Sequence, residues 1–378
     1  MKVIYFDNAS TTPLDSRVLD AMAPYLTNVY GNANSSHSVG RIAMRGLDDA
    51  RAMVADIIGA NFNEIYFTSG GSESNNFAIR GAFFSRKGRD KLVVSSIEHH
   101  SVLVTASEVQ KLGAKVEYVS PDKNGLLSVN DYQKVGLDDC FLACMMMANN
   151  EIGTIQPIKE FASACKECGA LSFVDAVQAV GVMDINVKDL GVDMLSFSAH
   201  KFGGPKGVGV LYIKNGTPVS PLITGGSQER GKRGGTSNVA GAVGLATALK
   251  LSRENLNEKV DAVRKLKDAL KNGILTEIPN ASVNGSEHCV PGILNVTFNG
   301  INGETLLYNL DINGVCASMG SACTAGTIEP SHVLKEIGLT DKQAKSSIRF
   351  SLSSKNTLEE VEETIEIIKK ASASACPR

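Results

Sequence analysis

The middle of the chain alternates between short apolar runs and longer stretches with helical periodicity, and this pattern restricts the possible folds more than any other feature. The runs are rich in the β-branched residues that strands favour. They are EIYFTS (64–69), KLVVSS (91–96), AKVEYVS (114–120), FLACMMMA (141–148), LSFVDA (171–176), VDMLSFS (192–198) and VGVLYI (208–213). Helical spacing of apolar residues marks segments between them, such as 39–60 and 158–170. The alternation predicts an α/β fold whose mostly parallel seven-stranded sheet is flanked by helices.

The last third of the chain has a different pattern. A long helical segment runs from about 238 to 273, and after it strands are fewer and mixed with helices. The strands are GILNVTF (292–298) and SSIRFSLS (346–353), and the helices are GETLLYNL (303–310) and TLEEVEETIEIIKKA (357–371). We therefore predict a large domain over 16–255 and a smaller α+β domain formed by 1–15 and 256–378.

Composition narrows the class of protein. The chain has 378 residues, 43% of them hydrophobic, and a formal net charge of −2, so nonspecific binding to nucleic acid or to an anionic membrane gains no support. The first residues, MKVIYFDNAS, lack the apolar stretch of a signal peptide. Because no apolar segment approaches the roughly 20 residues that span a bilayer, we expect a soluble, cytoplasmic protein whose partners are small molecules or other proteins.

Most of the eight cysteines are expected to be free thiols in the core, because nothing indicates secretion. Cys165 and Cys168 form one CxxC on a helical segment, which is weak evidence for zinc without a second pair, so we predict no metal site. Cys323 differs from the others. It lies in ASMGSACTAGTIEPSH among small and flexible residues, with no apolar periodicity that would bury it.

Two glycine-rich stretches are candidate phosphate sites. In EIYFTSGGSESNN a strand leads through Gly70 and Gly71 to Ser72 at the start of a helix, a combination that suits an anion but also an ordinary helix cap. GGSQERGKRGGT nearly matches a P-loop. However, Arg233 stands where a serine or threonine hydroxyl would hold magnesium, which argues against an NTPase.

Lys201 is the most informative single residue. It ends the strand of SFSAHKFGGPKG, and a lysine in a partly desolvated pocket becomes a nucleophile for carbonyl groups. Asp175 ends another strand, in FVDAVQAVG, and its carboxylate could pair with a protonated pyridine nitrogen. Together with a phosphate cradle at Ser72, these residues are the three handles that pyridoxal phosphate requires.

The ordered motifs resemble those of one family almost from end to end. They are YFDNASTTPL, FTSGGSESNN, EHHSVL, NNEIGTIQPI, VDAVQAVG, SFSAHKFGGPKGVG, GGSQERGKRGGTSN, GSACTAGTIEPSHVL and SSIRFSLS. The chain resembles a class V, fold-type I pyridoxal phosphate enzyme, and more closely a cysteine desulfurase of the NifS/IscS type. The resemblance implies a homodimer with pyridoxal 5'-phosphate as its cofactor.

The resemblance also implies roles around the cofactor. Lys201 would hold it as a Schiff base and then move the substrate α-proton, Asp175 would pair with the pyridine nitrogen, and Gln178 would bond the ring hydroxyl. His99 would stack on the ring, and Asn150 would contact the ring region. The phosphate group would be held by Gly71, Ser72, Ser198, His200 and, from the partner subunit, Thr236.

The same resemblance assigns substrate binding and sulfur transfer. Arg349 would clamp the substrate carboxylate, helped by Asn32 or its neighbours. Cys323 would attack the sulfur of L-cysteine, keep it as a persulfide and leave L-alanine, and its GSACTAG motif resembles the group with the longer loop. Cys316 is expected to pack on a strand.

Three alternatives stay open at this point. The same pocket could serve a selenocysteine lyase or another pyridoxal phosphate sulfur-lyase, although Cys323 favours desulfuration. A catalytically silent scaffold is disfavoured because Lys201 and Cys323 are both present. The sulfur acceptor could be an iron–sulfur scaffold protein or a tRNA-thiolating enzyme.

Overall fold

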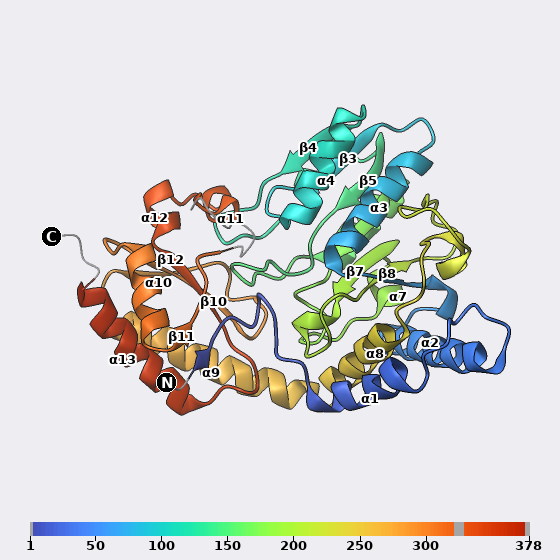
Figure 1. Ribbon diagram of the computed structural model, residues 1–378. Coiled ribbons are helices and arrows are strands. Elements are labelled where there is room, and N and C mark those ends of the chain that lie inside the picture. The colour runs from blue at the N-terminus through green and yellow to red at the C-terminus, as the bar shows by residue number, and fades with distance from the viewer. Residues whose placement is uncertain (1–2, 321–328, 375–378) are drawn as a thin grey trace.

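A seven-stranded sheet forms the centre of the larger part of the molecule in the computed structural model, which describes residues 3–320 and 329–374 (Figure 1). The strand order is β2-β8-β7-β6-β5-β3-β4. The strands are β2 (Ile65–Thr68), β3 (Lys91–Ser95), β4 (Lys115–Val119), β5 (Cys140–Cys144), β6 (Leu171–Asp175), β7 (Met194–Ser198) and β8 (Gly209–Ile213). Strand β8 runs antiparallel to both neighbours, and the remaining pairs are parallel. The predicted fold class is confirmed.

Helices bury both faces of this sheet, which explains why its strands are apolar at consecutive positions. Met194 packs in the core cluster that includes α3 (Gly71–Ser85) and α4 (His100–Lys111). Its neighbours Leu195 and Phe197 point to the opposite face and pack in the cluster of α2 and α8. The helices of this second layer are α1 (Ser16–Thr27), α2 (Ser38–Ile57), α6 (Ile158–Glu167) and α8 (Val239–Arg253).

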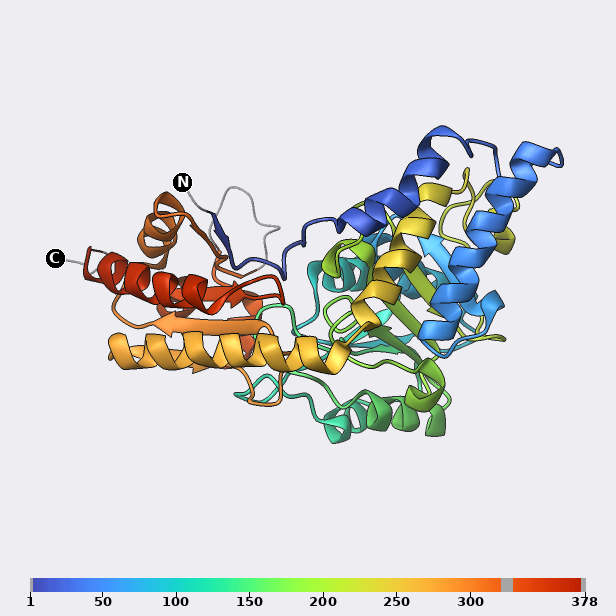
Figure 2. The same ribbon diagram turned by 90° about the horizontal axis from the view of Figure 1, so that it is seen from below.

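The smaller part has its own sheet and its own core (Figure 2). Strand β10 (Ile293–Phe298) pairs antiparallel with β9 (Ala281–Asn284) and β12 (Ser347–Ser351). The long helices α9 (Leu256–Glu277) and α13 (Leu358–Ser374) pack side by side against it, with α10 (Gly303–Ile312) next to α13. At the N-terminal end, β1 (Ile4–Tyr5) pairs parallel with β11 (Val315–Cys316), so the start of the chain joins this part.

The remaining elements are short. They are α5 (Val129–Lys134), α7 (Val187–Leu190), α11 (His332–Glu336), α12 (Asp341–Lys345) and the 3₁₀ turns η1 (Phe62–Glu64), η2 (Ala199–Lys201) and η3 (Gln228–Gly231). Within 3–320 and 329–374, no helix has both the length and the apolar character needed to cross a membrane.

The helical segment expected over about 238 to 273 is two helices rather than one. Helix α8 ends at Arg253 and α9 begins at Leu256, with Asn255 between them in the left-handed conformation (φ 52°). Asparagine adopts this conformation more readily than most residues, so the chain can turn there at low cost. The break falls at the predicted boundary between 255 and 256, and the division into domains itself stays a prediction.

Gly209 occupies a crowded position beside the candidate phosphate site. It opens β8 opposite Thr68 of β2 and Ser198 of β7. A Cβ atom there would lie 2.7 Å from Gly70 Cα and 2.8 Å from the Phe197 carbonyl oxygen. Both obstacles are backbone atoms, so only glycine fits without moving the chain where β2 and β7 end.

We expect Gly209→Ala to lower the free energy of unfolding by about 1–3 kcal/mol, the usual cost of overpacking a rigid interior. The matched control is Gly225→Ala, because a Cβ there would meet nothing closer than Gly234 Cα at 3.7 Å. Urea unfolding of both variants measures the difference. Equal stability of the two variants would contradict the crowding argument.

Candidate active site

A cavity of about 260 Å³ lies at the edge of the large sheet where β6 and β7 end and α3 begins. Ligands of α/β proteins bind at this edge. Ten of the residues predicted from the sequence line it together: Gly71, Ser72, His99, Asn150, Asp175, Gln178, Ser198, His200, Lys201 and Arg349. The structure thus brings together residues as far apart in the sequence as Gly71 and Arg349, which are separated by 278 positions.

Lys201 reaches the cavity from η2, the turn that follows β7. Its Nζ donates to the carbonyl oxygens of Ala9 at 2.7 Å and Ser10 at 2.9 Å. Gln178, which follows β6, also donates to the Ala9 carbonyl, through Nε2 at 3.0 Å. The N-terminal segment therefore holds the amine on the floor of the cavity, within reach of a carbonyl compound bound there.

Asp175 is buried at the end of β6 and is held by Asn75 of α3. Its Oδ2 accepts from Asn75 Nδ2 at 2.7 Å, and its Oδ1 accepts from the Val177 backbone N–H at 2.9 Å. Asn75 Oδ1 in turn accepts from the Ser196 hydroxyl at 2.6 Å, which orients the amide. Sequence reasoning missed Asn75. Its only signal is an amide on the buried face of the helix that Ser72 opens.

His99 caps α4 and faces the same cavity. Its Nδ1 accepts from the Ser101 backbone N–H at 3.1 Å and lies 2.8 Å from the Ser101 hydroxyl. An accepting Nδ1 places the proton of the neutral ring on Nε2. Burial lowers the pKa of His99, and the positive charge of Lys201 lowers it further against the opposing effect of Asp175. The ring is therefore neutral near pH 7.

The N-terminus of α3 forms the candidate phosphate cradle. Gly71 and Ser72 open this 15-residue helix, whose free N–H groups favour an anion, and Ser198 and His200 line the same cavity. His200 Nδ1 lies 3.1 Å from Thr11 Oγ1. Burial and the nearby lysines lower the pKa of His200 to about 4, so this ring can hold a phosphate by hydrogen bonding without a charge of its own.

Arg349 reaches the cavity from β12 of the smaller part, and its side chain is 2% exposed. Its Nη2 donates to Asp7 Oδ1 at 2.8 Å and Ser10 Oγ at 2.7 Å, and its Nη1 donates to the Asn150 carbonyl at 2.9 Å. Its Nε finds no acceptor among the described residues. A guanidinium at this position suits a carboxylate, and the substrate-binding role of Arg349 stays a prediction.

Other predicted residues do not line this cavity within the single chain. Asn32 is exposed, and its Oδ1 accepts from the Asn34 backbone N–H at 2.9 Å. Thr236 is exposed on the loop before α8. Cys323 lies outside the described residues. Cys316 packs on β11 as expected, and burial raises the pKa of its thiol.

Glu98 is a second residue that sequence reasoning missed. Its buried Oε1 accepts from the Ser95 hydroxyl at 2.9 Å and the Met146 backbone N–H at 2.5 Å, whereas its Oε2 has no partner among the described residues. Burial, reinforced by the negative charge of Asp175, raises the pKa of Glu98 to about 8. The group is mostly protonated at pH 7 and so keeps a second negative charge away from Asp175.

Comparison with known proteins gives one consistent result. The aminotransferase class-V family matches residues 4–364. The chain is 45% identical over 373 residues to the cysteine desulfurase IscS of Clostridium botulinum, a match that covers 98% of this chain and 94% of that protein. Among solved structures, a NifS-like protein superposes with a TM-score of 0.92 at 38% identity, covering 97% of this chain and 98% of that one. SspA in complex with cysteine gives 0.83 at 35% identity, covering 94% and 100%.

The burial of Glu98 predicts a distinctive pH dependence of stability. Its folded pKa of about 8 lies above its ordinary value of 4.5, so folding takes up a proton between these values. Its contribution to the free energy of unfolding therefore falls as pH rises through this window, by up to roughly 1.4 kcal/mol per pH unit. The glutamine of Glu98→Gln cannot ionise. Between pH 5 and pH 8 we therefore expect the free energy of unfolding of this variant to rise by several kcal/mol relative to that of the parent.

Urea unfolding at several pH values tests this expectation. The matched control is Glu117→Gln, because Glu117 is exposed on β4. The difference between Glu98→Gln and the parent should grow with pH, and the difference for the control should stay near zero. A constant difference for Glu98→Gln would contradict the raised pKa.

Proposed function

This chain belongs to the aminotransferase class-V family, and from that premise we propose that it is a cysteine desulfurase, which takes the sulfur of L-cysteine and releases L-alanine. One observation carries the proposal. Lys201, Asp175, the α3 N-terminus and Arg349 all line one cavity, so an amine, a carboxylate, an anion cradle and a carboxylate receptor converge there. These are the groups that a pyridoxal phosphate enzyme acting on an amino acid needs.

The donor set fits pyridoxal 5'-phosphate. Ser72, Ser198 and His200 would hold its phosphate at the helix N-terminus, Asp175 would pair with its pyridine N–H, and Lys201 would bond its aldehyde carbon. His99 would lie against its ring, with Gln178 and Asn150 at the ring edge. The bound cofactor supplies an electron-accepting ring that stabilises negative charge at the substrate α-carbon.

The chain's own residues would orient the substrate and move its protons. Arg349 would bind the α-carboxylate of L-cysteine through its guanidinium, which lines the cavity. Lys201 Nζ, once freed, would take the α-proton, since the carbonyls of Ala9 and Ser10 hold it beside the cavity. Asn75 would keep the Asp175 carboxylate aimed at the pyridine nitrogen.

Sulfur would leave by way of Cys323. Its thiolate would attack the substrate sulfur, the bond between that sulfur and the substrate β-carbon would break, and the electron pair on the β-carbon would take a proton. The products would be L-alanine and a persulfide on Cys323.

We further propose a homodimer, in which Thr236 and the loop of Asn32 complete the partner's site, and a protein acceptor that serves iron–sulfur cluster assembly or tRNA thiolation. The cytoplasmic location stays a prediction.

Lys201→Ala tests the covalent handle. We expect loss of the visible absorbance of the lysine-bound cofactor, because Lys201 is the only lysine among the described residues that line the cavity. The matched control is Lys206→Ala, an exposed lysine of the same loop, which should keep the parent spectrum. An unchanged spectrum in Lys201→Ala would refute the assignment.

Cys323→Ala tests the sulfur step. With L-cysteine and a reductant, the parent should release alanine and sulfide in equal amounts, whereas the variant should keep its cofactor spectrum but release neither. Cys316→Ala is the control, since this thiol packs on β11. Pyruvate and ammonia in place of alanine would indicate another sulfur-lyase, and full activity in Cys323→Ala would remove that residue from the mechanism.

A further inference from the structure

A second cavity, of about 250 Å³, adjoins the candidate active site. The two cavities share the residues Ala9, Val177, Gln178 and Lys201. The Ala9 carbonyl that accepts from Lys201 Nζ therefore belongs to the wall between them. None of the proposed steps uses this second cavity, so its chemistry needs its own explanation.

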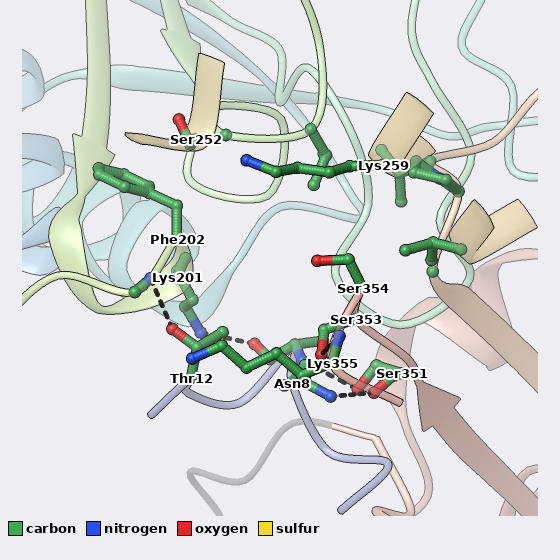
Figure 3. A pocket seen from close by; sticks show the side chains of 18 of the residues that line it. Asn8, Thr12, Lys201, Phe202, Ser252, Lys259, Ser351, Ser353, Ser354 and Lys355 are labelled. Atoms are coloured by element: carbon green, nitrogen blue, oxygen red, sulfur yellow. Dashed lines mark hydrogen bonds between the residues drawn. The ribbon is translucent and has the colours of Figure 1, made fainter. Parts of the chain in front are cut away.

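The cavity lies at the junction of the two parts of the molecule (Figure 3). One side comes from the larger part, with Phe202 after β7 and Leu251 near the end of α8. The other side comes from the smaller part, with Val260 and Val263 of α9 and Ile293 of β10. The break at Asn255 adjoins it, since Ser252 and Leu256 on either side both line the cavity. Any occupant would contact both parts at the point where the chain passes from one to the other.

The body of the cavity is apolar. Its aliphatic and aromatic lining residues are Val177, Val180, Val182, Phe202, Leu251, Leu256, Val260, Val263, Val290, Ile293 and Leu352. Such a lining favours an apolar ligand by roughly 25 cal/mol for each Å² removed from water. The volume suits a small molecule rather than a peptide.

The polar side of the cavity carries an excess of positive charge. Lys259 and Lys355 extend along opposite sides of the cavity (Figure 3), and Arg17 also lines it. Asp15 is the carboxylate that lines this side, and Arg17 already binds both of its oxygens, at 3.0 and 2.9 Å. Lys259 Nζ donates to the Leu251 carbonyl at 2.8 Å, which leaves its remaining protons and its charge available.

Lys355 is a positively charged residue on this side of the cavity that no ion pair with a carboxylate compensates within the described residues. The residue is exposed and takes part in no ion pair within the described ranges 3–320 and 329–374. The Arg17 hydrogen bond lowers the pKa of Asp15 to about 2, and the charge of Lys355 adds a smaller lowering effect. Ser353 and Ser354 also line this side of the cavity.

We propose that this cavity binds a small amphipathic carboxylate, with its anionic group beside Lys355 and its apolar chain or ring against α9 and Phe202. Among the described residues Lys355 takes part in no ion pair, so one negative charge on the ligand would compensate it, and the apolar walls match the rest of the ligand. Because the ligand would touch both parts and the Ala9 wall, its binding would also restrain the segment that holds Lys201. The site goes beyond the proposed function and does not depend on it.

Octanoate is the probe, titrated by calorimetry into the full chain with its cofactor bound. Lys355→Gln should raise the dissociation constant of octanoate roughly tenfold, the equivalent of about 1.4 kcal/mol, and leave that of octan-1-ol unchanged. The matched control is Lys265→Gln, an exposed lysine of α9 that does not line the cavity, which should bind octanoate as the parent does. Octylamine should bind more weakly than octanoate.

A second variant locates the site. Val260→Trp fills the cavity from a half-buried position and should abolish octanoate binding. If Val260→Trp binds octanoate normally, the ligand lies elsewhere, including at Arg349, and the proposal fails. It also fails if the parent does not bind octanoate, if octylamine binds as tightly, or if Lys355→Gln and Lys265→Gln behave alike. None of these results would affect the assays of alanine and sulfide release.

Discussion

The segment from Asp7 to Thr12 is the constraint on which both cavities depend. Residues from both parts hold it: Ser351 of β12 binds Asn8 and Ala9, at 2.8 Å in each case, while Lys201 binds the Ala9 and Ser10 carbonyls. It is therefore bonded to both parts at once and separates the two cavities. A shift of this segment would move the Lys201 amine and the Arg349 guanidinium together.

Burial keeps several ionisable groups at the edge of the larger sheet in their neutral forms, because it shifts the pKa values of Glu98, His99 and His200. Asp175 stays hydrogen-bonded by Asn75 and a backbone N–H, whereas Glu98, a short distance away, has a pKa of about 8 and an oxygen without a partner. His99 and His200 lose their charge for the same reason, desolvation beside Lys201. The site thus concentrates charge on the few groups that would meet a charged part of the cofactor or the substrate.

Strand patterns in the sequence predicted the fold class and marked Lys201, Asp175 and Ser72, whereas the other predicted cavity residues came from the resemblance to a known family. Lys201, Asp175 and Ser72 each follow an apolar run, so their local context marks them. Asn75 and Glu98 were missed because their roles come from contacts across the fold, such as the bond between Asn75 and Asp175, 100 positions apart. The turn at Asn255 was missed for a different reason: helical periodicity continues on both sides of one left-handed residue.

Arg349 shows how one side chain can serve structure and chemistry together. Burying a charged guanidinium away from water is costly unless acceptors meet its N–H donors. The Arg349 side chain is 2% exposed, and Asp7, Ser10 and Asn150 accept hydrogen bonds from two of its three nitrogens. The third, Nε, is buried and has no acceptor among the described residues. A lysine could not replace it, because one ammonium cannot bond three fixed acceptors and still present a planar edge to a substrate. The same fork therefore joins β12 to the N-terminal segment at the edge of the cavity.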